Sequence, residues 1–375
     1  MKDGYPTGKA DLMTAFMVHV QGLTHRGGTW AMINLPSWMS LKSFEELRHD
    51  LLRGQRIVSM VHLGRGIFGS DFGTVAFVVD NVSAMNARGV YRRLFEQHVD
   101  VRTVTTIEAL FRDANYNRFK VSQADFAAIP GSPIVYWLSE KMRAAFKVGK
   151  PMGELVDLLV GLRTGDNSRF MRQWWEVSQD RTLLGCESLA DAAASGARWF
   201  PYNKGGAFRK WYGNQEHVIN WEHDGREVEE GLAERYPYMV PKGKTVVRGQ
   251  GRDRYFSPSV SWSKISSGAP AFRYYPPGFI FDVAGTSIFA ASSQERLALL
   301  SFANSQLAFE QLAAIAPTLN FEVGQVAGLP IADSTAESGM ALAARAVETA
   351  QADWNTLETS WDFERNLLIQ IAAHE

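Results

Sequence analysis

The stretch from Ile57 to Asp80 constrains the fold of this chain more than any other segment. It contains an apolar run from Ile57 to Leu63, a glycine-rich loop, and a second apolar run from Thr74 to Val79. Apolar runs this short, rich in β-branched residues and bounded by glycines, are typical of strands that are buried on both faces. The sequence therefore predicts a β-hairpin whose loop presents Phe68 and Phe72 at the edge of a sheet.

The loop of this hairpin also carries a glycine pattern that has a second interpretation. Gly64, Gly66 and Gly69 match the G-x-G-x-x-G pattern of dinucleotide-binding proteins. In that motif a strand precedes the glycines and the N-terminus of a helix follows them, because the helix end holds the phosphates. Here a second strand is expected to follow, so the pattern favours the hairpin over a nucleotide site.

The segments before the hairpin alternate between helical and extended patterns. Residues 9–23 and 43–52 place apolar side chains at helical spacing, and Thr29 to Leu35 reads as a buried strand. Such alternation predicts an α/β fold at the N-terminal end. Residues 81–150 form a mixed connector, and the character of the sequence changes after residue 150, where we place the main domain boundary.

Composition excludes several classes of protein. The 375 residues are 46% hydrophobic and 21% charged, which is ordinary for a globular chain of one to three domains. No apolar run approaches the roughly 18 residues of a membrane helix, and no apolar signal segment is evident at the N-terminus. The single cysteine, Cys186, excludes an internal disulfide and a cysteine-rich zinc site. We therefore expect a cytoplasmic protein with no membrane partner and no metal.

Basic residues are concentrated in one stretch, although the net charge is only −1. From Lys242 to Arg273 the only acidic residue is Asp253. The basic residues of this stretch are Lys242, Lys244, Arg248, Arg252, Arg254, Lys264 and Arg273. This distribution predicts one local surface for an anionic ligand.

Two further segments have the composition of a nucleic-acid surface. Residues 161–170, GLRTGDNSRF, form a glycine-containing loop whose Arg163, Thr164 and Asn167 suit contacts to phosphates. Residues 198–212 interleave aromatic side chains with cations and one amide. The cations Lys204, Arg209 and Lys210 suit contacts to phosphates, and Asn203 suits contacts to base edges, as does the arginine. The alternative interpretations are a polar surface turn for the first segment and core aromatics with solvated charges for the second.

The longer motifs carry a resemblance to a known family. They are HLGRGIFGSDFGTVAFVV at 62–79, RWFPYNKGGAFRKWYGNQEHVINWEHDG at 198–225, WSKISSG at 262–268 and GFIFDVAG at 278–285. These segments resemble the adenine-specific DNA methyltransferases of the BREX phage-exclusion systems, the PglX family, and the related type IIG restriction-modification enzymes. The resemblance extends from about residue 5 to residue 370.

The resemblance implies a domain plan. Residues 1–150 are expected to form the C-terminal half of a Rossmann-like methyltransferase sheet with a connector, in α/β style. Residues 151–333 are expected to form a mixed α+β DNA target-recognition domain, and residues 334–375 a C-terminal helical segment. In the family, the S-adenosylmethionine-binding half and the catalytic Asn-Pro-Pro-Tyr loop precede such a segment. Neither feature is found in this sequence. For the catalytic loop, the only Pro-Pro pair, Pro276-Pro277, lies in a Tyr-Pro-Pro-Gly turn.

The resemblance also implies roles for individual residues. In these enzymes an aromatic residue of the hairpin loop stacks on the adenine that is flipped out of the duplex. Phe68 is the first candidate for this role and Phe72 the second, and the alternative is that both belong to the hairpin core. The expected DNA contacts are Arg163, Thr164, Asn167, Asn203, Lys204, Arg209, Lys210, Lys264, Ser266, Ser267 and Arg273.

These expectations define the function that the sequence favours. The chain would be part of an N6-adenine DNA methyltransferase, supplying base stacking and DNA recognition but inactive alone, with no catalytic residue of its own. S-adenosylmethionine would serve the complete enzyme and would not bind this chain alone. Expected partners are double-stranded DNA, a separate chain that carries the missing half, and other phage-exclusion proteins. The alternative is a non-catalytic DNA-recognition module or an inert remnant. In either case an exposed apolar sheet face is expected where the missing half would pack.

Overall fold

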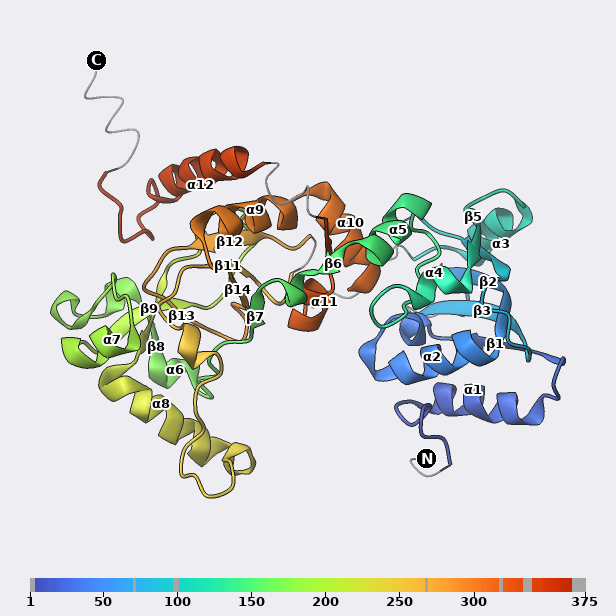
Figure 1. The fold of residues 1–375 in the computed structure, drawn as a ribbon, viewed down its shortest axis with the longest axis horizontal. Helices are drawn as coiled ribbons and strands as arrows, with labels where there is room; N and C mark the ends of the chain where they lie inside the picture. The colour runs from blue at the N-terminus through green and yellow to red at the C-terminus, as the bar shows by residue number, and fades with distance from the viewer. Residues whose placement is uncertain are drawn as a thin grey trace, which may run out of the picture. The chain divides into compact units, whose positions relative to one another are not determined.

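A computed structural model describes residues 4–69, 72–96, 101–266, 269–316, 320–332 and 339–365. The chain forms two compact units, Met1–Gly149 and Lys150–Glu375, each with its own sheets (Figure 1). Both units mix helices and strands, so the molecule as a whole is of mixed α/β type with several sheets. We describe each unit by itself.

The first unit is built on one five-stranded sheet in the order β1-β3-β2-β4-β5. Its strands are β1 (Thr29–Asn34), β2 (Arg56–Arg65), β3 (Gly73–Asp80), β4 (Arg88–Arg93) and β5 (Arg118–Ser122). Its helices are α1 (Leu12–Leu23), α2 (Glu45–Gly54), α3 (Val104–Arg112), α4 (Gln123–Ala127) and α5 (Glu140–Val148). Strands β2 and β3 pair in antiparallel register, with Met60 opposite Phe77, which confirms the predicted hairpin.

One face of this sheet is covered by helices and holds the core. Trp30, Trp38, Phe77 and Tyr91 are buried there, on the side where α2 packs. A buried guanidinium strengthens the contact, because Arg48 donates hydrogen bonds to the carbonyl oxygens of Trp38, Leu41 and Gly131 at 2.7–2.9 Å. Burial lowers the Arg48 pKa to about 10.

The other face of the sheet is apolar and open. Side chains alternate between the two faces of a strand, so Ala31 and Ile33 of β1 point away from the core side chain of Trp30. They line a shallow hollow of about 360 Å³ together with Val61 of β2 and Val78 of β3. Ile33 is 55% exposed. The expected exposed apolar face is therefore a feature of this unit.

The second unit contains two four-stranded sheets, β13-β9-β10-β8 and β12-β11-β14-β7, and a two-stranded ribbon, β15-β6. Its strands are β6 (Lys150–Pro151), β7 (Asp157–Leu159), β8 (Met171–Gln173), β9 (Trp199–Asn203), β10 (His217–Asn220), β11 (Ser259–Trp262), β12 (Phe272–Tyr275), β13 (Ile280–Phe281), β14 (Ser287–Phe289) and β15 (Pro330–Ile331). Its helices are α6 (Asn167–Phe170), α7 (Leu189–Ser195), α8 (Glu222–Arg235), α9 (Ser293–Ala303), α10 (Gln306–Ile315), α11 (Val323–Ala327) and α12 (Met340–Trp354).

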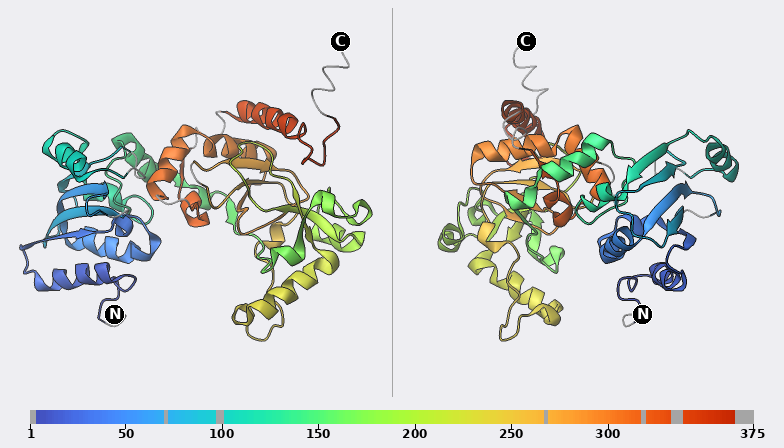
Figure 2. Two further views of the ribbon diagram at one scale, coloured as in Figure 1. Left: turned by 180° about the vertical axis from the view of Figure 1, so that it is seen from behind. Right: turned by 45° about the vertical axis from the view of Figure 1, so that its right-hand side comes forward.

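Aromatic side chains fill the core of this unit. Phe200, Tyr202, Trp221 and Phe281 are buried between its strands and α8. Several helices begin at serine caps. At the start of α9, for example, the side chain of Ser292 accepts a hydrogen bond from the amide of Glu295. Helix α12 lies along α9, as Figure 2 shows from behind, and ends at the buried Trp354.

Within the described ranges, no helix is both long enough and apolar enough to span a membrane.

Candidate nucleic-acid interface

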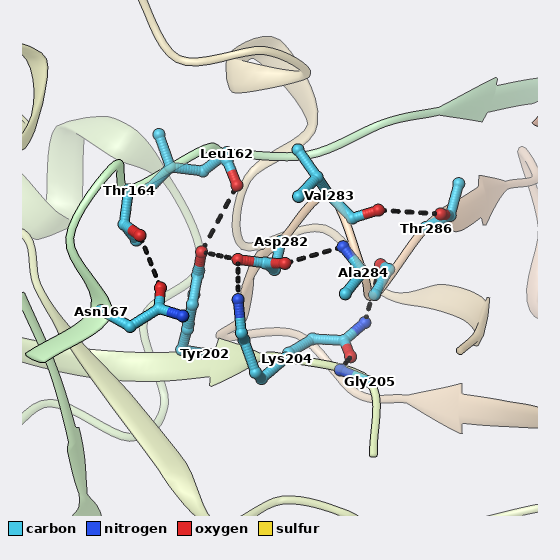
Figure 3. A network of polar contacts seen from close by, with 12 residues as sticks. Leu162, Thr164, Asn167, Tyr202, Lys204, Gly205, Asp282, Val283, Ala284 and Thr286 are labelled. Atoms are coloured by element: carbon cyan, nitrogen blue, oxygen red, sulfur yellow. Dashed lines mark hydrogen bonds and ion pairs between the residues drawn. The ribbon is translucent and has the colours of Figure 1, made fainter. Parts of the chain in front are cut away.

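Three of the sequence motifs, which are far apart in the chain, meet at one place in the second unit (Figure 3). Strand β13 runs parallel to β9 and pairs Ile280 with Tyr202. On the other side of β13, the amide of Leu162 donates to the carbonyl of Phe281 at 2.7 Å. The amide of Val283 donates back to the Leu162 carbonyl at 3.1 Å. The 161–170 loop, the 199–206 segment and the 278–285 segment therefore form one assembly.

Close backbone approach explains a glycine in this assembly. A Cβ atom added to Gly161 would lie 1.9 Å from the carbonyl oxygen of Phe281, which no side chain can accommodate. Gly161 is thus required for the hydrogen bonds that join the first motif to the third.

A buried carboxylate ties the second and third motifs together, and its partner Tyr202 reaches the first at the Leu162 carbonyl, 3.4 Å away. Asp282 is 1% exposed, and its Oδ2 accepts the Tyr202 hydroxyl at 2.5 Å and Lys204 Nζ at 2.7 Å. Its Oδ1 accepts the amide of Ala284 at 2.7 Å, as Figure 3 shows. Both oxygens of the buried carboxylate therefore accept hydrogen bonds, and its charge is paired with Lys204. Burial and the neighbouring Asp282 raise the Tyr202 pKa well above its usual value, so this hydroxyl stays a donor.

Sequence reasoning did not select Tyr202 or Asp282. Both lie in motifs that the sequence identified, but no spacing rule relates two residues that are 80 positions apart. Their partnership depends on the pairing of β9 with β13.

The predicted loop residues Arg163, Thr164 and Asn167 are divided between surface and interior. Arg163 and Asn167 are exposed, whereas Thr164 is buried and its hydroxyl donates to Asn167 Oδ1 at 2.6 Å. Asp166 caps the short helix α6 by accepting the amide of Arg169 at 3.1 Å. The pKa of Asp166 is lowered by its hydrogen bonds from Ser168 and this amide. The loop thus presents Arg163 and Asn167 to solvent in a defined conformation.

Two predicted DNA contacts, Asn203 and Arg273, are instead buried and hydrogen bonded within the chain. Asn203 Nδ2 donates to Ser261 Oγ at 2.7 Å and to the Gly285 carbonyl at 3.1 Å. Arg273 is 0% exposed and donates to the carbonyls of Ala207 and Arg209 and to Ser263 Oγ. These groups join segments of the unit, so we do not include them among the proposed DNA contacts.

The other predicted cations have partners within the chain, and only the pairs of Arg209 and Lys264 are with exposed carboxylates. Lys204 faces Asp282, Arg209 lies 3.2 Å from Asp353, and Lys264 lies 3.0 Å from Glu322. Lys210 Nζ donates to the Asn304 carbonyl at 3.0 Å. Exposed pairs of this kind are weak and exchange readily for other anions.

The serines that follow Lys264 complete the predicted set. The Ser266 hydroxyl donates to the Ala269 carbonyl at 3.0 Å. Ser267 lies outside the described residues.

In the first unit, the two hairpin phenylalanines are exposed. Phe68 is 64% exposed and Phe72 68%, so the alternative that both belong to the hairpin core is wrong. Their role in base stacking stays a prediction.

The glycine pattern of this hairpin does not form a phosphate cradle. A strand, β3, follows the loop in place of a helix. A Cβ atom on Gly66 would lie 2.1 Å from the carbonyl oxygen of Arg102, so the space beside this glycine is filled by protein backbone. The hairpin therefore lacks the strand–glycine–helix arrangement of a dinucleotide site. Among the described residues no group of three or more His, Cys, Asp or Glu is placed to hold a metal ion.

No family model matches this chain. Its fold is that of a restriction-modification enzyme: the structure of the type IIL enzyme MmeI in complex with DNA has a TM-score of 0.51 at 10% identity, covering 96% of this chain and 47% of that one. At this identity the likeness concerns the fold alone.

Two curated proteins are similar along nearly the whole sequence. The adenine-specific methyltransferase PglX of Lacticaseibacillus casei (strain Zhang) is 35% identical over 377 residues, which are 99% of this chain and 31% of that protein. The adenine-specific methyltransferase BrxX of Escherichia coli O9:H4 (strain HS) is 35% identical over 373 residues, 98% of this chain and 29% of that protein. The resemblance to the PglX family is therefore confirmed, and the chain spans about a third of the length of these relatives.

Proposed function

We propose that this chain is part of a site-specific, S-adenosylmethionine-dependent N6-adenine DNA methyltransferase of a phage-defence system. The observation that carries the proposal is the 35% identity to two adenine-specific methyltransferases along 98–99% of the chain. In this proposal the chain contributes target-base stacking and DNA recognition, and it does not methylate DNA alone.

The first unit is proposed to be the C-terminal half of a Rossmann-like methyltransferase sheet. Strand β1 lies at the end of the sheet and pairs with β3 alone among the described strands. Beside it the apolar side chains of Ile33, Val61 and Val78 are open to solvent. Both features are expected of a sheet that is completed by further strands and helices, supplied by a separate chain.

Phe68 is proposed to stack on the flipped adenine, with Phe72 as the second candidate. An enzyme that acts on a base must extract it and hold it against flat apolar groups. The two rings are exposed at the end of the hairpin, where a strand pair supports them.

The second unit is proposed to bind double-stranded DNA. The exposed Arg163 and Asn167 are the leading contacts, because the Thr164 hydrogen bond and the Asp282 network hold their loop in place. Arg209, Lys210, Lys264 and Ser266 would add contacts by exchanging their present partners for phosphates, and Lys204 would add one while it keeps its bond to Asp282. Asn203 and Arg273 would act by joining the segments that carry these residues.

The alternative function is a DNA-recognition module that has no catalytic role, or an inert remnant. We infer that S-adenosylmethionine belongs to the complete enzyme, that the protein is cytoplasmic, and that other phage-exclusion proteins act with it.

Isothermal titration with S-adenosylmethionine separates the two functions. The chain is titrated alone, and then together with whatever upstream-encoded protein its genome offers. Binding only in the mixture supports a split methyltransferase. Binding by the chain alone would contradict the assignment of the cofactor to the missing half. Binding in neither case, with duplex binding retained, supports the recognition module.

A further inference from the structure

A loop after helix α8 carries basic residues that the proposed interface leaves unused. From Arg235 to Arg252 the sequence holds five basic residues and no acidic one. They are Arg235, Lys242, Lys244, Arg248 and Arg252. Helix α8 has the opposite charge, with six acidic residues: Glu222, Asp224, Glu227, Glu229, Glu230 and Glu234. The positive charge is therefore concentrated beyond the C-terminal end of this helix, where Figure 1 shows the loop extending. We call residues 236–248 the basic arm.

The basic arm is anchored at both ends. The amide of Tyr236 donates to the Leu232 carbonyl at 2.9 Å, which continues α8 into the arm. After the arm, the amide of Gly249 donates to Glu229 Oε1 at 3.1 Å, and Val247 is buried. The arm thus leaves and rejoins the body of the unit at fixed points.

A tight turn shapes the tip of the arm. The amide of Lys244 donates to the Pro241 carbonyl at 2.9 Å, and Gly243 has φ of 78°. A positive φ at the third position of a four-residue turn favours glycine. The turn presents Lys242 and Lys244, which are both exposed, on either side of Gly243.

Like Arg163, the cations of the arm lack partners within the described part of the chain, whereas Lys204, Arg209, Lys210 and Lys264 are paired. Lys242, Lys244 and Arg248 have no carboxylate within 4.0 Å and no side-chain hydrogen bond among the described residues. Tyr238, between them and α8, is 80% exposed. Unpaired cations beside an exposed tyrosine are the side chains that proteins place against DNA phosphates and sugars.

The base of the arm touches the loop that carries Arg163 and Asn167. A Cβ atom on Gly165 would lie 3.1 Å from Leu232 and 3.6 Å from the Tyr236 ring. Arg235 lies 3.8 Å from Asp166 in the same loop. The arm is therefore continuous with the proposed DNA-binding surface around Arg163 and Asn167.

We propose that the basic arm is a second DNA contact of this protein, in which Lys242, Lys244 and Arg248 bind backbone phosphates independently of sequence. Tyr238 packs against the sugar-phosphate backbone beside them. The inference rests on the proposed DNA recognition by this unit, and it adds a site that fixes the duplex on one side of the recognition loop.

The test compares two triple variants of the full chain. In the arm variant, Lys242, Lys244 and Arg248 are changed to alanine. In the control variant, three exposed cations outside the proposed surface, Arg112, Lys141 and Arg226, are changed to alanine, so the net charge falls equally. Binding of a labelled duplex of random sequence is measured by fluorescence anisotropy from 50 to 200 mM NaCl, and circular dichroism checks the folding of each variant.

Three phosphate contacts contribute about 2.7 to the slope of log affinity against log salt, at about 0.9 per contact. Over this fourfold salt range the wild type should lose about 40-fold more affinity than the arm variant. The control variant should keep the wild-type slope. A folded arm variant with the wild-type slope would overturn the inference, as would an equal loss in the control variant.

A further variant separates this inference from the function on which it rests. In Arg163→Ala the arm is intact. If Arg163→Ala binds the duplex more weakly than the wild type and the arm variant binds it equally well, the DNA-recognition proposal is supported and only the proposal for the arm is rejected. If the wild-type chain does not bind the duplex, both proposals fail together.

Discussion

Lys204 Nζ lies 2.7 Å from Oδ2 of the buried Asp282, although 78 residues separate them in the sequence. This pair, with the Tyr202 hydroxyl, joins two strands and the loop of a third motif. The proposed recognition surface is therefore supported by a buried polar network.

Removal of the Asp282 carboxylate should destabilise the second unit. In Asp282→Ala the partly buried Lys204 and the buried Tyr202 hydroxyl lose their shared acceptor, which should lower the free energy of unfolding by about 3 kcal/mol. Urea denaturation measures this change. Asp353→Ala, which removes the exposed partner of Arg209, is the control and should cost less than about 1 kcal/mol. Equal effects in the two variants would contradict the structural role of Asp282.

An alanine at position 161 should also be destabilising. Its Cβ would collide with the Phe281 carbonyl, so either the Leu162–Phe281 hydrogen bond breaks or the strand moves, at a cost of about 1–3 kcal/mol. Gly22→Ala in helix α1, where a Cβ would meet nothing within 4 Å, should be neutral or stabilising. Thermal unfolding followed by circular dichroism distinguishes the two. A melting temperature of Gly161→Ala equal to that of the wild type would show that the close approach is absent.

The Thr164 hydroxyl should affect recognition without affecting salt dependence. Thr164→Val keeps the shape of the buried side chain but removes the hydrogen bond to Asn167. We expect weaker binding to the methylation site of the complete enzyme, by about 5–10-fold, because one hydrogen bond contributes about 1 kcal/mol. The salt slope should stay unchanged, since no cation is removed. Filter binding at several salt concentrations checks both quantities, and a changed slope would argue against this role.

Phe68 should matter for methylation and not for folding. Because its ring is largely exposed, Phe68→Ala should leave the unfolding free energy within about 0.5 kcal/mol of the wild type. In the reconstituted enzyme, loss of one base–aromatic contact of about 1–3 kcal/mol should lower kcat/KM by about 5–160-fold. Tritiated methyl transfer to duplex DNA measures it. Phe111→Ala, an exposed phenylalanine on α3, is the control. Loss of activity in Phe72→Ala alone would move the role to Phe72.

The stability of the second unit should fall as the pH drops below about 6.5. Burial is the main cause that lowers the pKa of His217 below its usual value of 6.5. Between its folded pKa and 6.5 the unfolded chain binds more protons than the folded chain, so stability rises with pH in this window and is lost on acidification. Unfolding in urea between pH 7 and pH 5 should show a smaller loss for His217→Gln than for the wild type. Parallel losses in both proteins would exclude His217 as the cause.

The amino-acid sequence by itself determined the local elements of this protein and its kinship. The hairpin of β2 and β3 and the alternation of helix and strand before it follow from periodicity, which is a property of a few adjacent residues. The motifs at 161–170, 198–225 and 278–285 were identified by their resemblance to a known family.

Only the tertiary structure decided which side chain of each motif is free to bind and which is used for folding. Asn203 and Arg273 looked like DNA contacts, yet their partners, Ser261, Gly285 and the 207–209 backbone, are distant in sequence or lie across a strand pairing. Phe68 and Phe72 looked equally suited to a core, yet the hairpin leaves both rings in solvent. Whether a side chain is buried depends on which strands pair over long distances in the sequence. That pairing is decided by the packing of the whole chain, and no local sequence pattern specifies it.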